Sequence, residues 1–323
     1  MPEPPILAVS GLHVRFGATH VVNGVGFSVA AGQTLALLGE SGSGKSVTAR
    51  AIMGLVRPPR GQITAGTVLL HGQDLLALPE EQRRKLRSTT ISMVFQDALS
   101  ALNPVLSVGY QIAELFREHR GMSRAEARRA AVDVLGQVRI PAAARRAGDY
   151  PHQFSGGMRQ RVGIALAIAL RPDVIIADEP TTALDVTVQA QILRLLAEIQ
   201  REHGTALVLI THDMSVVAQV ADQVAVMYAG RVVEQAATGQ IYAAPRHPYT
   251  EALLGAIPRP HLRGRQLPVI PGAPPDLSVP DPGCRFRPRC RYGADACKQA
   301  PPEHDLGDGR RTACHEWERV GSA

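Results

Sequence analysis

The segment GESGSGKS, residues 39–46, constrains the fold of this chain more than any other stretch. It fits the pattern G-x-x-x-x-G-K-[ST] and lies between an apolar run, TLALLG, and a helical stretch, SVTARAIMGL. Glycines let the backbone wrap closely around phosphates, and the N–H groups at a helix start point toward negative charge. The strand, loop and helix together therefore predict a phosphate-binding loop. On this segment alone, an ordinary glycine-rich turn remains the alternative.

Each part of the predicted loop has an expected task. Lys45 is expected to reach the terminal phosphates of a nucleotide, and the hydroxyl of Ser46 is expected to hold Mg²⁺. Only three lysines occur in a chain whose basic residues are otherwise arginine, so Lys45 stands out. The residues of this segment expected to contact nucleotide are Gly39, Glu40, Ser41, Gly42, Ser43, Gly44, Lys45, Ser46 and Val47.

A second stretch, DVIIADEPTTALD, covers residues 173–185. Its β-branched run predicts a buried parallel strand that ends at Asp178, at the sheet edge where ligands of such folds bind. Asp178 is then expected to hold Mg²⁺, directly or through water. Glu179 is placed to accept a proton from an attacking water, which is the role of a general base. Taken alone, the two acids could equally cap a helix or lie in a solvated turn.

Length and composition indicate a globular chain. Its 323 residues, 45% of them hydrophobic, predict one large domain and something smaller. The N-terminus lacks a signal-peptide pattern, and the longest clean apolar run, VGIALAIAL, is too short to span a membrane. We therefore expect a cytosolic chain with reduced thiols. The net charge of +6 leaves nucleic acid, an anionic membrane surface and phosphate ligands open as partners.

Further motifs follow one another in a fixed order. Gln96 lies in VFQD, FSGGMRQR begins at Phe154, the ALD loop is Ala183 to Asp185, and His212 follows the apolar run LVLI. Together with the phosphate loop and the acidic pair, this order resembles the ATP-binding subunit of an ATP-binding-cassette transporter. The resemblance covers about residues 5–255. It implies an ATPase that uses Mg²⁺ and closes over two ATP molecules as a pair of cassettes.

The resemblance also implies roles for single residues. Phe16 matches the aromatic residue that stacks on adenine, although a core phenylalanine is the plain alternative. Gln96 matches the residue that senses Mg²⁺ and the attacking water, and His212 matches the switch histidine that contacts the terminal phosphate. The signature residues are implied to act on the nucleotide held by the opposing subunit, and they are Ser155, Gly156, Gly157 and Met158.

Three further segments resemble those of the dipeptide and oligopeptide importers. They are VFQDALSALNPVLSVGYQI, which contains Gln96 and the residues after it, HPYTEALLGAIP at residues 247–258 and PGAPPDL at residues 271–277. The resemblance implies a peripheral subunit on the cytoplasmic face of the cell membrane. Its implied partners are a second cassette chain that is homologous but different, two transmembrane permease subunits and an extracytoplasmic solute-binding protein. Importers of nickel, glutathione or oligosaccharide and exporters remain alternatives, whereas a nucleic-acid or ribosome partner is not expected.

All four cysteines lie near the C-terminus, with the spacing C-x5-C-x6-C-x16-C: Cys284, Cys290, Cys297 and Cys314. Spacing alone leaves zinc, an iron–sulfur cluster, disulfides and idle thiols open. The resemblance implies a four-iron, four-sulfur cluster, with zinc as the alternative. The nearby arginines are expected to help hold the thiolates deprotonated and to offset the charge of a cluster, and they are Arg285, Arg287, Arg289 and Arg291.

The predicted fold class is α/β. It combines a phosphate-loop ATPase core with an antiparallel β subdomain, an inserted helical subdomain at about residues 97–165 and a small irregular C-terminal extension that carries the cysteines. The predicted domains are residues 1–255, the cassette, and residues 256–323, the extension. Rich in proline, glycine and arginine, the extension lacks hydrophobic periodicity and is not expected to build a core without a staple.

Overall fold

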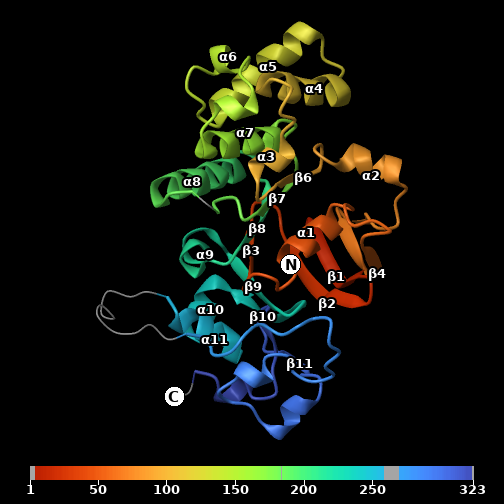
Figure 1. Ribbon diagram of the computed structural model, residues 1–323, viewed down its shortest axis with the longest axis vertical. Coiled ribbons are helices and arrows are strands. Elements are labelled where there is room, and N and C mark those ends of the chain that lie inside the picture. Colours follow the sequence, from red (N-terminus) through yellow and green to blue (C-terminus); the bar gives the residue numbers. More distant parts are fainter. Residues whose placement is uncertain (1–3, 183, 258–268, 322–323) are drawn as a thin grey trace. The chain divides into compact units, whose positions relative to one another are not determined.

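The computed structural model describes residues 4–182, 184–257 and 269–321 (Figure 1). The described chain divides into two compact units. The first unit contains residues 4–6, 29–33 and, apart from residue 183, 77–209. The second unit contains residues 7–28, 34–76, 210–257 and 269–321. Ala183, the first residue of the predicted ALD loop, lies outside the described residues. The predicted domain boundaries at residues 97, 165 and 255 stay predictions.

In the second unit, four strands form an antiparallel sheet. They are β1 (Leu7–Phe16), β2 (Thr19–Val29), β4 (Gln62–Leu70) and β5 (Gln73–Asp74), in the order β2-β1-β4-β5. Strand β1 alternates buried and accessible residues, and Val9 lies opposite Val68. This period of two turns one face toward an apolar interior. It confirms the predicted antiparallel subdomain.

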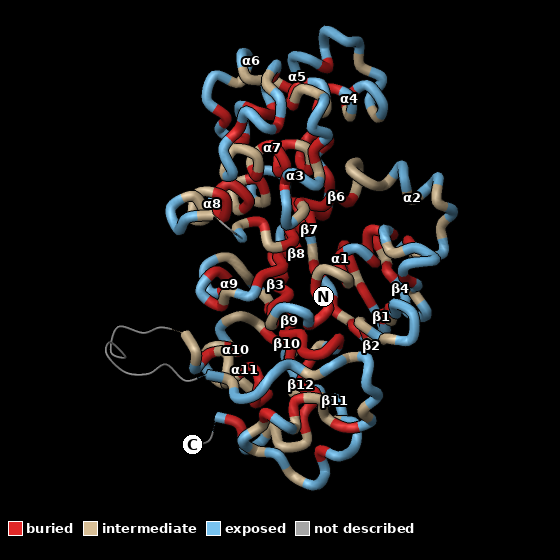
Figure 2. The backbone as a smooth tube through the Cα atoms, viewed as in Figure 1, coloured by how far each residue is buried: buried red, intermediate tan, exposed pale blue. Residues whose placement is uncertain are grey.

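A second set of strands in this unit has the order β11-β12-β10-β9-β3. Strands β3 (Thr34–Leu38) and β9 (Gln223–Tyr228) are parallel, whereas β9 and β10 (Arg231–Ala237) are antiparallel. Every residue of β3 is buried, and so is every residue of β9 after the first (Figure 2). The helices of the unit are α1 (Lys45–Ile52), α9 (Met214–Val220), α10 (Thr238–Ala243) and α11 (Pro248–Gly255).

The C-terminal extension adds its residues to the core of this unit. Strands β11 (Glu303–Asp305) and β12 (Arg311–Ala313) pair with each other, and β12 pairs with β10 (Figure 1). Phe286 is 2% exposed and packs edge-on against the rings of Tyr228 and Tyr249. The extension is otherwise built of short 3-10 turns, η3 (Arg287–Arg289), η4 (Asp295–Lys298) and η5 (Trp317–Arg319). It therefore uses an existing core instead of building its own.

In the first unit, three buried strands lie in the order β8-β7-β6, which are β8 (Ala206–Thr211), β7 (Val174–Asp178) and β6 (Ile91–Val94). Strands β6 and β7 are parallel, with Met93 opposite Ile176. Such buried and mostly apolar strands are typical of parallel sheets. This agrees with the strand predicted to end at Asp178.

Helices make up the rest of the first unit: α2 (Glu80–Leu86), α3 (Ala98–Ala101), α4 (Val108–Arg120), α5 (Arg124–Gln137), α6 (Ala143–Arg146), α7 (Gly156–Ile168) and α8 (Val186–His203), with the 3-10 turn η1 (Pro151–Gln153). Ser107 caps α4, and Ser123 and Glu126 form a capping box on α5. Such caps satisfy backbone N–H groups that the first turn leaves unpaired. Within the described residues, no helix is both long enough and apolar enough to cross a membrane.

Candidate active site

The phosphate loop follows β3 directly and ends where α1 begins, at Lys45. Gly39 has a φ of +155°, and a Cβ atom there would lie 2.2 Å from the carbonyl oxygen of Met227. Gly44 has a φ of +102°, and its Cβ would lie 2.8 Å from the carbonyl oxygen of Val21. Both positions therefore require glycine, for conformation and for space. The local strand, loop and helix predicted from the sequence are confirmed.

Lys45 lies back across this loop with its side chain almost entirely buried. Its Nζ donates to the carbonyl oxygens of Gly39, at 2.7 Å, and Glu40, at 2.9 Å, and the residue is 4% exposed. A buried ammonium among loop carbonyls, next to the start of a helix, makes this end of the unit electropositive. This arrangement suits the binding of an anion such as a phosphate group.

Phe16 and His212 belong to the same unit. Phe16 ends β1 and is 37% exposed, and its ring lies so close to Gly61 that a Cβ there would be 2.7 Å from Cε1. The exposed part of the ring leaves surface for stacking on a planar base. His212 follows β8 and is exposed, directly before Asp213, which caps α9. Their roles toward adenine and the terminal phosphate stay predictions.

In the first unit, Glu179 and Gln96 meet. Gln96 Nε2 donates to Glu179 Oε2 at 3.1 Å, and the hydroxyl of Thr182 donates to the same oxygen at 2.8 Å. Glu179 follows the buried Asp178 and has a φ of +44°, a strained conformation of the kind found at functional sites. The two donors fix the orientation of the carboxylate. Sequence reasoning missed Thr182, although its hydroxyl three residues after the acid is a readable signal.

The signature segment forms the start of α7. Ser155 is the N-cap residue, and its hydroxyl accepts the N–H of Met158 at 3.4 Å. A Cβ on Gly157 would lie 2.8 Å from Cγ1 of Val188, so this helix start lies close to α8. Ser155 and Gly156 are exposed, which leaves an N–H-rich helix end accessible to an anion. Their action on a partner's nucleotide stays a prediction.

The four cysteines are reduced, and their sulfurs receive backbone hydrogen bonds. The sulfur of Cys314 accepts the N–H of Glu316 at 3.4 Å. Backbone N–H groups nearby also lower the pKa of the Cys284 and Cys290 thiols, although burial raises both by more. Within the described residues, however, no three His, Cys, Asp or Glu side chains come together in an arrangement that could hold a metal ion.

Burial outweighs the arginines at these sulfurs: it raises the pKa of the Cys284 thiol, and Arg287 lowers that pKa by a smaller amount. The expected help of the arginines in holding ligated thiolates deprotonated stays a prediction. Burial raises the pKa of the Cys290 thiol to about 11 and that of the Cys314 thiol to about 12. Arg289 instead binds Glu40, and Arg291 binds Glu251 at 2.6 Å. Two of the four guanidinium groups are thus directed at carboxylates, and burial is the largest influence on the pKa values of the Cys284, Cys290 and Cys314 thiols.

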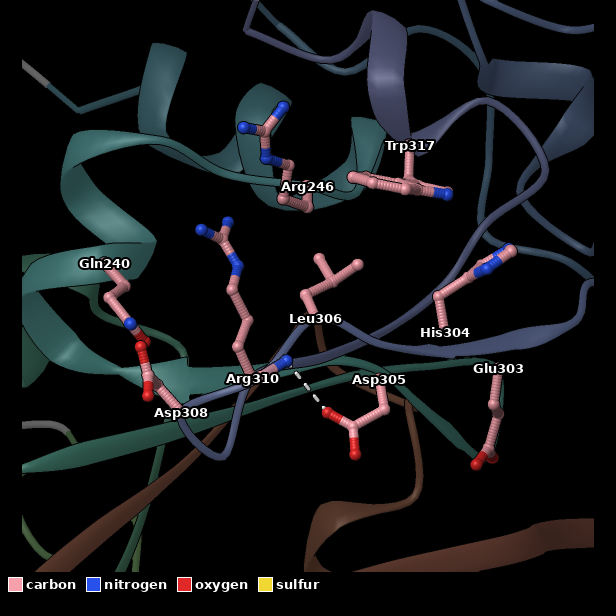
Figure 3. A pocket seen from close by; sticks show the side chains of 10 residues that line it. Gln240, Arg246, Glu303, His304, Asp305, Leu306, Asp308, Arg310 and Trp317 are labelled. Atoms are coloured by element: carbon pink, nitrogen blue, oxygen red, sulfur yellow. Dashed lines mark hydrogen bonds between the residues drawn. The ribbon is translucent and has the colours of Figure 1, made fainter.

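An open pocket of about 660 Å³ is lined mostly by the extension, and no residue predicted to touch nucleotide belongs to its lining (Figure 3). Its lining mixes acidic residues with Arg246 and Arg310. Arg246 lies 5.8 Å from the ring of Trp317, and Arg310 forms an ion pair with the buried Glu234 at 3.1 Å. The arginines are thus engaged within the protein. The lining residues are Gln240, Arg246, Glu303, His304, Asp305, Leu306, Gly307, Asp308, Arg310 and Trp317.

A phosphate loop after a parallel strand, an oriented acid after a second strand and a capped Ser-Gly-Gly helix start are the parts of an ATP-binding cassette. Residues 22–182 match the ABC transporter family, and residues 233–297 match the C-terminal region of oligopeptide and dipeptide transporters. The chain belongs to the ABC transporter family, among the ATPases that carry this C-terminal region. The family predicted from the order of the motifs is confirmed.

Relatives match over nearly the whole chain. The sequence is 50% identical to the dipeptide transport ATP-binding protein DppD of Bacillus subtilis, over 95% of this chain and 93% of that protein. It is 48% identical to the oligopeptide transport ATP-binding protein OppD of Salmonella typhimurium, over 97% of this chain and 95% of that protein. Among solved structures, the ATP-binding cassette MJ0796 bound to ADP and Pi matches with a TM-score of 0.64 and 29% identity, over 72% of this chain and 98% of that one.

Proposed function

We propose that this chain is the ATP-hydrolysing subunit of a peptide importer and drives a separate membrane permease. The orientation of Glu179 by Gln96 and Thr182 carries the proposal, because it prepares a general base for hydrolysis. The relatives named for dipeptide and oligopeptide transport support peptides as the cargo. The match of residues 233–297, which include the first part of the extension, to the C-terminal region of such transporters supports the same substrate class.

The proposed reaction is attack of a water oxygen on the terminal phosphorus of ATP, with cleavage of the bond to the bridging oxygen. The loop from Gly39 to Val47 holds the phosphates, and Phe16 stacks on adenine. Glu179 takes the proton of the water, and His212 contacts the terminal phosphate. Mg²⁺ would neutralise phosphate charge, with Ser46, Gln96 and Asp178 as its proposed residues. The helix start of Ser155 serves the nucleotide of an opposing cassette.

The proposed partners follow from the family. They are a second cassette chain, two permease subunits and an extracytoplasmic solute-binding protein, and the chain is proposed to lie on the cytoplasmic face of the membrane. The absence of a spanning helix among the described residues fits a peripheral role. No nucleic-acid partner is proposed.

Purification of the tagged chain from detergent-solubilised membranes tests this function. We expect two permease chains to co-purify. After reconstitution in lipid vesicles, we expect the solute-binding protein to stimulate ATP hydrolysis when it is loaded with peptide, and much less when it is empty. Stimulation by a nickel-loaded or oligosaccharide-loaded protein instead would contradict the peptide assignment. Co-purification with ribosomes or RNA would contradict the importer itself.

We also propose that the four cysteines hold a four-iron, four-sulfur cluster. Four thiolates are the usual ligand set for such a cluster, and N–H groups directed at sulfur stabilise a ligated thiolate. The described cysteines are not grouped in an arrangement that could hold a metal ion in this structure. The proposal therefore rests on the ligand set, with a single tetrahedral zinc as the alternative.

Elemental analysis of the chain after anaerobic purification tests the cluster. We expect about four irons and four acid-labile sulfides per chain, and loss of both in a Cys290→Ser variant. The matched control is Ser278→Ala, which changes an exposed hydroxyl of the extension and is expected to keep the iron. A colourless protein with stoichiometric zinc would show that the cluster assignment is wrong.

A further inference from the structure

The phosphate loop contains one acidic residue, Glu40, next to its first glycine. A carboxylate in a loop that binds ATP faces a difficulty, because its charge repels the phosphates at short range. The sequence shows the acid but gives no indication of what offsets its charge. The structure supplies a partner from the C-terminal extension.

Arg289 of the turn η3 forms a two-pronged ion pair with Glu40. Its Nη1 lies 2.7 Å from Oε2, and its Nη2 lies 3.0 Å from Oε1. The arginine side chain is 5% exposed, and its Nε donates to the carbonyl oxygen of Pro271 at 2.8 Å. A paired and nearly buried arginine of this kind is held in one orientation. It therefore fixes the carboxylate as well as neutralising it.

The backbone of Glu40 is held as well. The hydroxyl of Tyr249 accepts its N–H at 2.8 Å, and Nζ of Lys45 donates to its carbonyl oxygen at 2.9 Å. Tyr249 comes from the HPYT segment of α11 and is fully buried. Glu40 is thus held at its N–H, its carbonyl oxygen and its carboxylate. Two of these three contacts come from sequence more than two hundred residues away.

We propose that Arg289 is a positioning residue for ATP binding, which holds and neutralises Glu40 so that the phosphate loop can accept the triphosphate. Arg289 lies between Cys284 and Cys290, so the cysteine-bearing segment takes part in shaping the nucleotide site. The inference rests on the proposed function of the loop as the ATP site. It assigns to the extension a task in the ATPase cycle beyond covering the core.

Calorimetric titration of ATP into the purified full-length chain tests the proposal. Arg289→Met leaves the carboxylate of Glu40 unpaired beside the phosphates, and we expect the Kd for ATP to rise about tenfold or more. Glu40→Gln removes the charge itself and is expected to change the Kd less than about threefold. In the double variant, Glu40→Gln with Arg289→Met, the affinity is expected to return to within about threefold of wild type.

Arg291→Met is the matched control. This arginine belongs to the same segment, but its guanidinium pairs with Glu251 and is largely exposed. We expect its ATP affinity to equal that of the wild type. If Arg289→Met does not fold, the same comparison is made with Arg289→Gln, alone and combined with Glu40→Gln. Glutamine at position 289 keeps hydrogen-bond donors but removes the positive charge.

The rescue separates positioning from a purely structural contact. If the double variant binds ATP as weakly as Arg289→Met, then charge at Glu40 is not the cause and the proposal is overturned. It is also overturned if Arg289→Met binds ATP like the wild type while Lys45→Ala loses binding. If Lys45→Ala binds as tightly as the wild type, the phosphate-loop assignment fails, and this inference fails with it.

Discussion

Replacement of Glu179 by glutamine is expected to remove nearly all ATP turnover while ATP binding persists. Glutamine keeps the size of the side chain and an oxygen that can accept from Gln96 and Thr182, so the local geometry survives. It cannot accept the proton of the attacking water. General bases contribute about 10²- to 10⁴-fold to such steps. We expect a loss of kcat in that range in the purified membrane complex, with the Kd for ATP changed only slightly.

Glu198→Gln is the control for this substitution. Glu198 lies on α8 of the same unit, where it pairs with Arg139 at 2.7 Å, and it has no part in the predicted site. Its replacement by the same residue is expected to leave kcat unchanged. If the Glu179→Gln complex hydrolysed ATP at the wild-type rate, the general-base assignment would be wrong.

The parts of the site that follow from sequence are those built by local interactions. Gly39 and Gly44 are required by backbone conformation and by a close carbonyl oxygen, and both constraints belong to the short loop and the strands beside it. The capped start of α7 likewise depends on Ser155 and the three residues that follow. Motif order then identified the family, because each motif reports a nearby turn or helix start.

What sequence could not predict is which distant charges meet. The sequence places Arg289 next to the thiols, but its side chain binds Glu40, 249 residues earlier in the chain. The HPYT segment was recognised as a family feature, yet nothing in its spacing places the hydroxyl of Tyr249 on a loop N–H. The extension also contributes Phe286 to a core that its own composition could not build. These contacts depend on tertiary packing, which a local pattern does not encode.

His247, the first residue of the HPYT segment, makes the stability of the second unit depend on pH. It is 1% exposed, its Nδ1 accepts the N–H of Tyr249 at 3.1 Å, and its own N–H donates to the carboxylate of Glu234. Burial lowers the pKa of His247 to about 3. The folded protein therefore keeps the ring neutral, whereas the unfolded chain takes up a proton near the ordinary histidine pKa of about 6.5.

Between pH 6.5 and 3 the unfolded state binds more protons than the folded state, so the stability due to His247 is present above that window and is lost as pH falls. The slope approaches about 1.4 kcal/mol per pH unit. Burial raises the pKa of Glu234, which works in the opposite direction, because the stability due to Glu234 is lost as pH rises.

His247→Asn keeps an acceptor for the N–H of Tyr249 but cannot titrate. We expect the melting temperature of the wild type to fall by several degrees more than that of His247→Asn between pH 7 and pH 5, because a difference of about 2 kcal/mol shifts the melting temperature by that much. Glu234 is present in both proteins, so its effect cancels in the comparison. If the melting temperatures of the wild type and of His247→Asn fell equally between pH 7 and pH 5, that result would contradict a buried neutral His247.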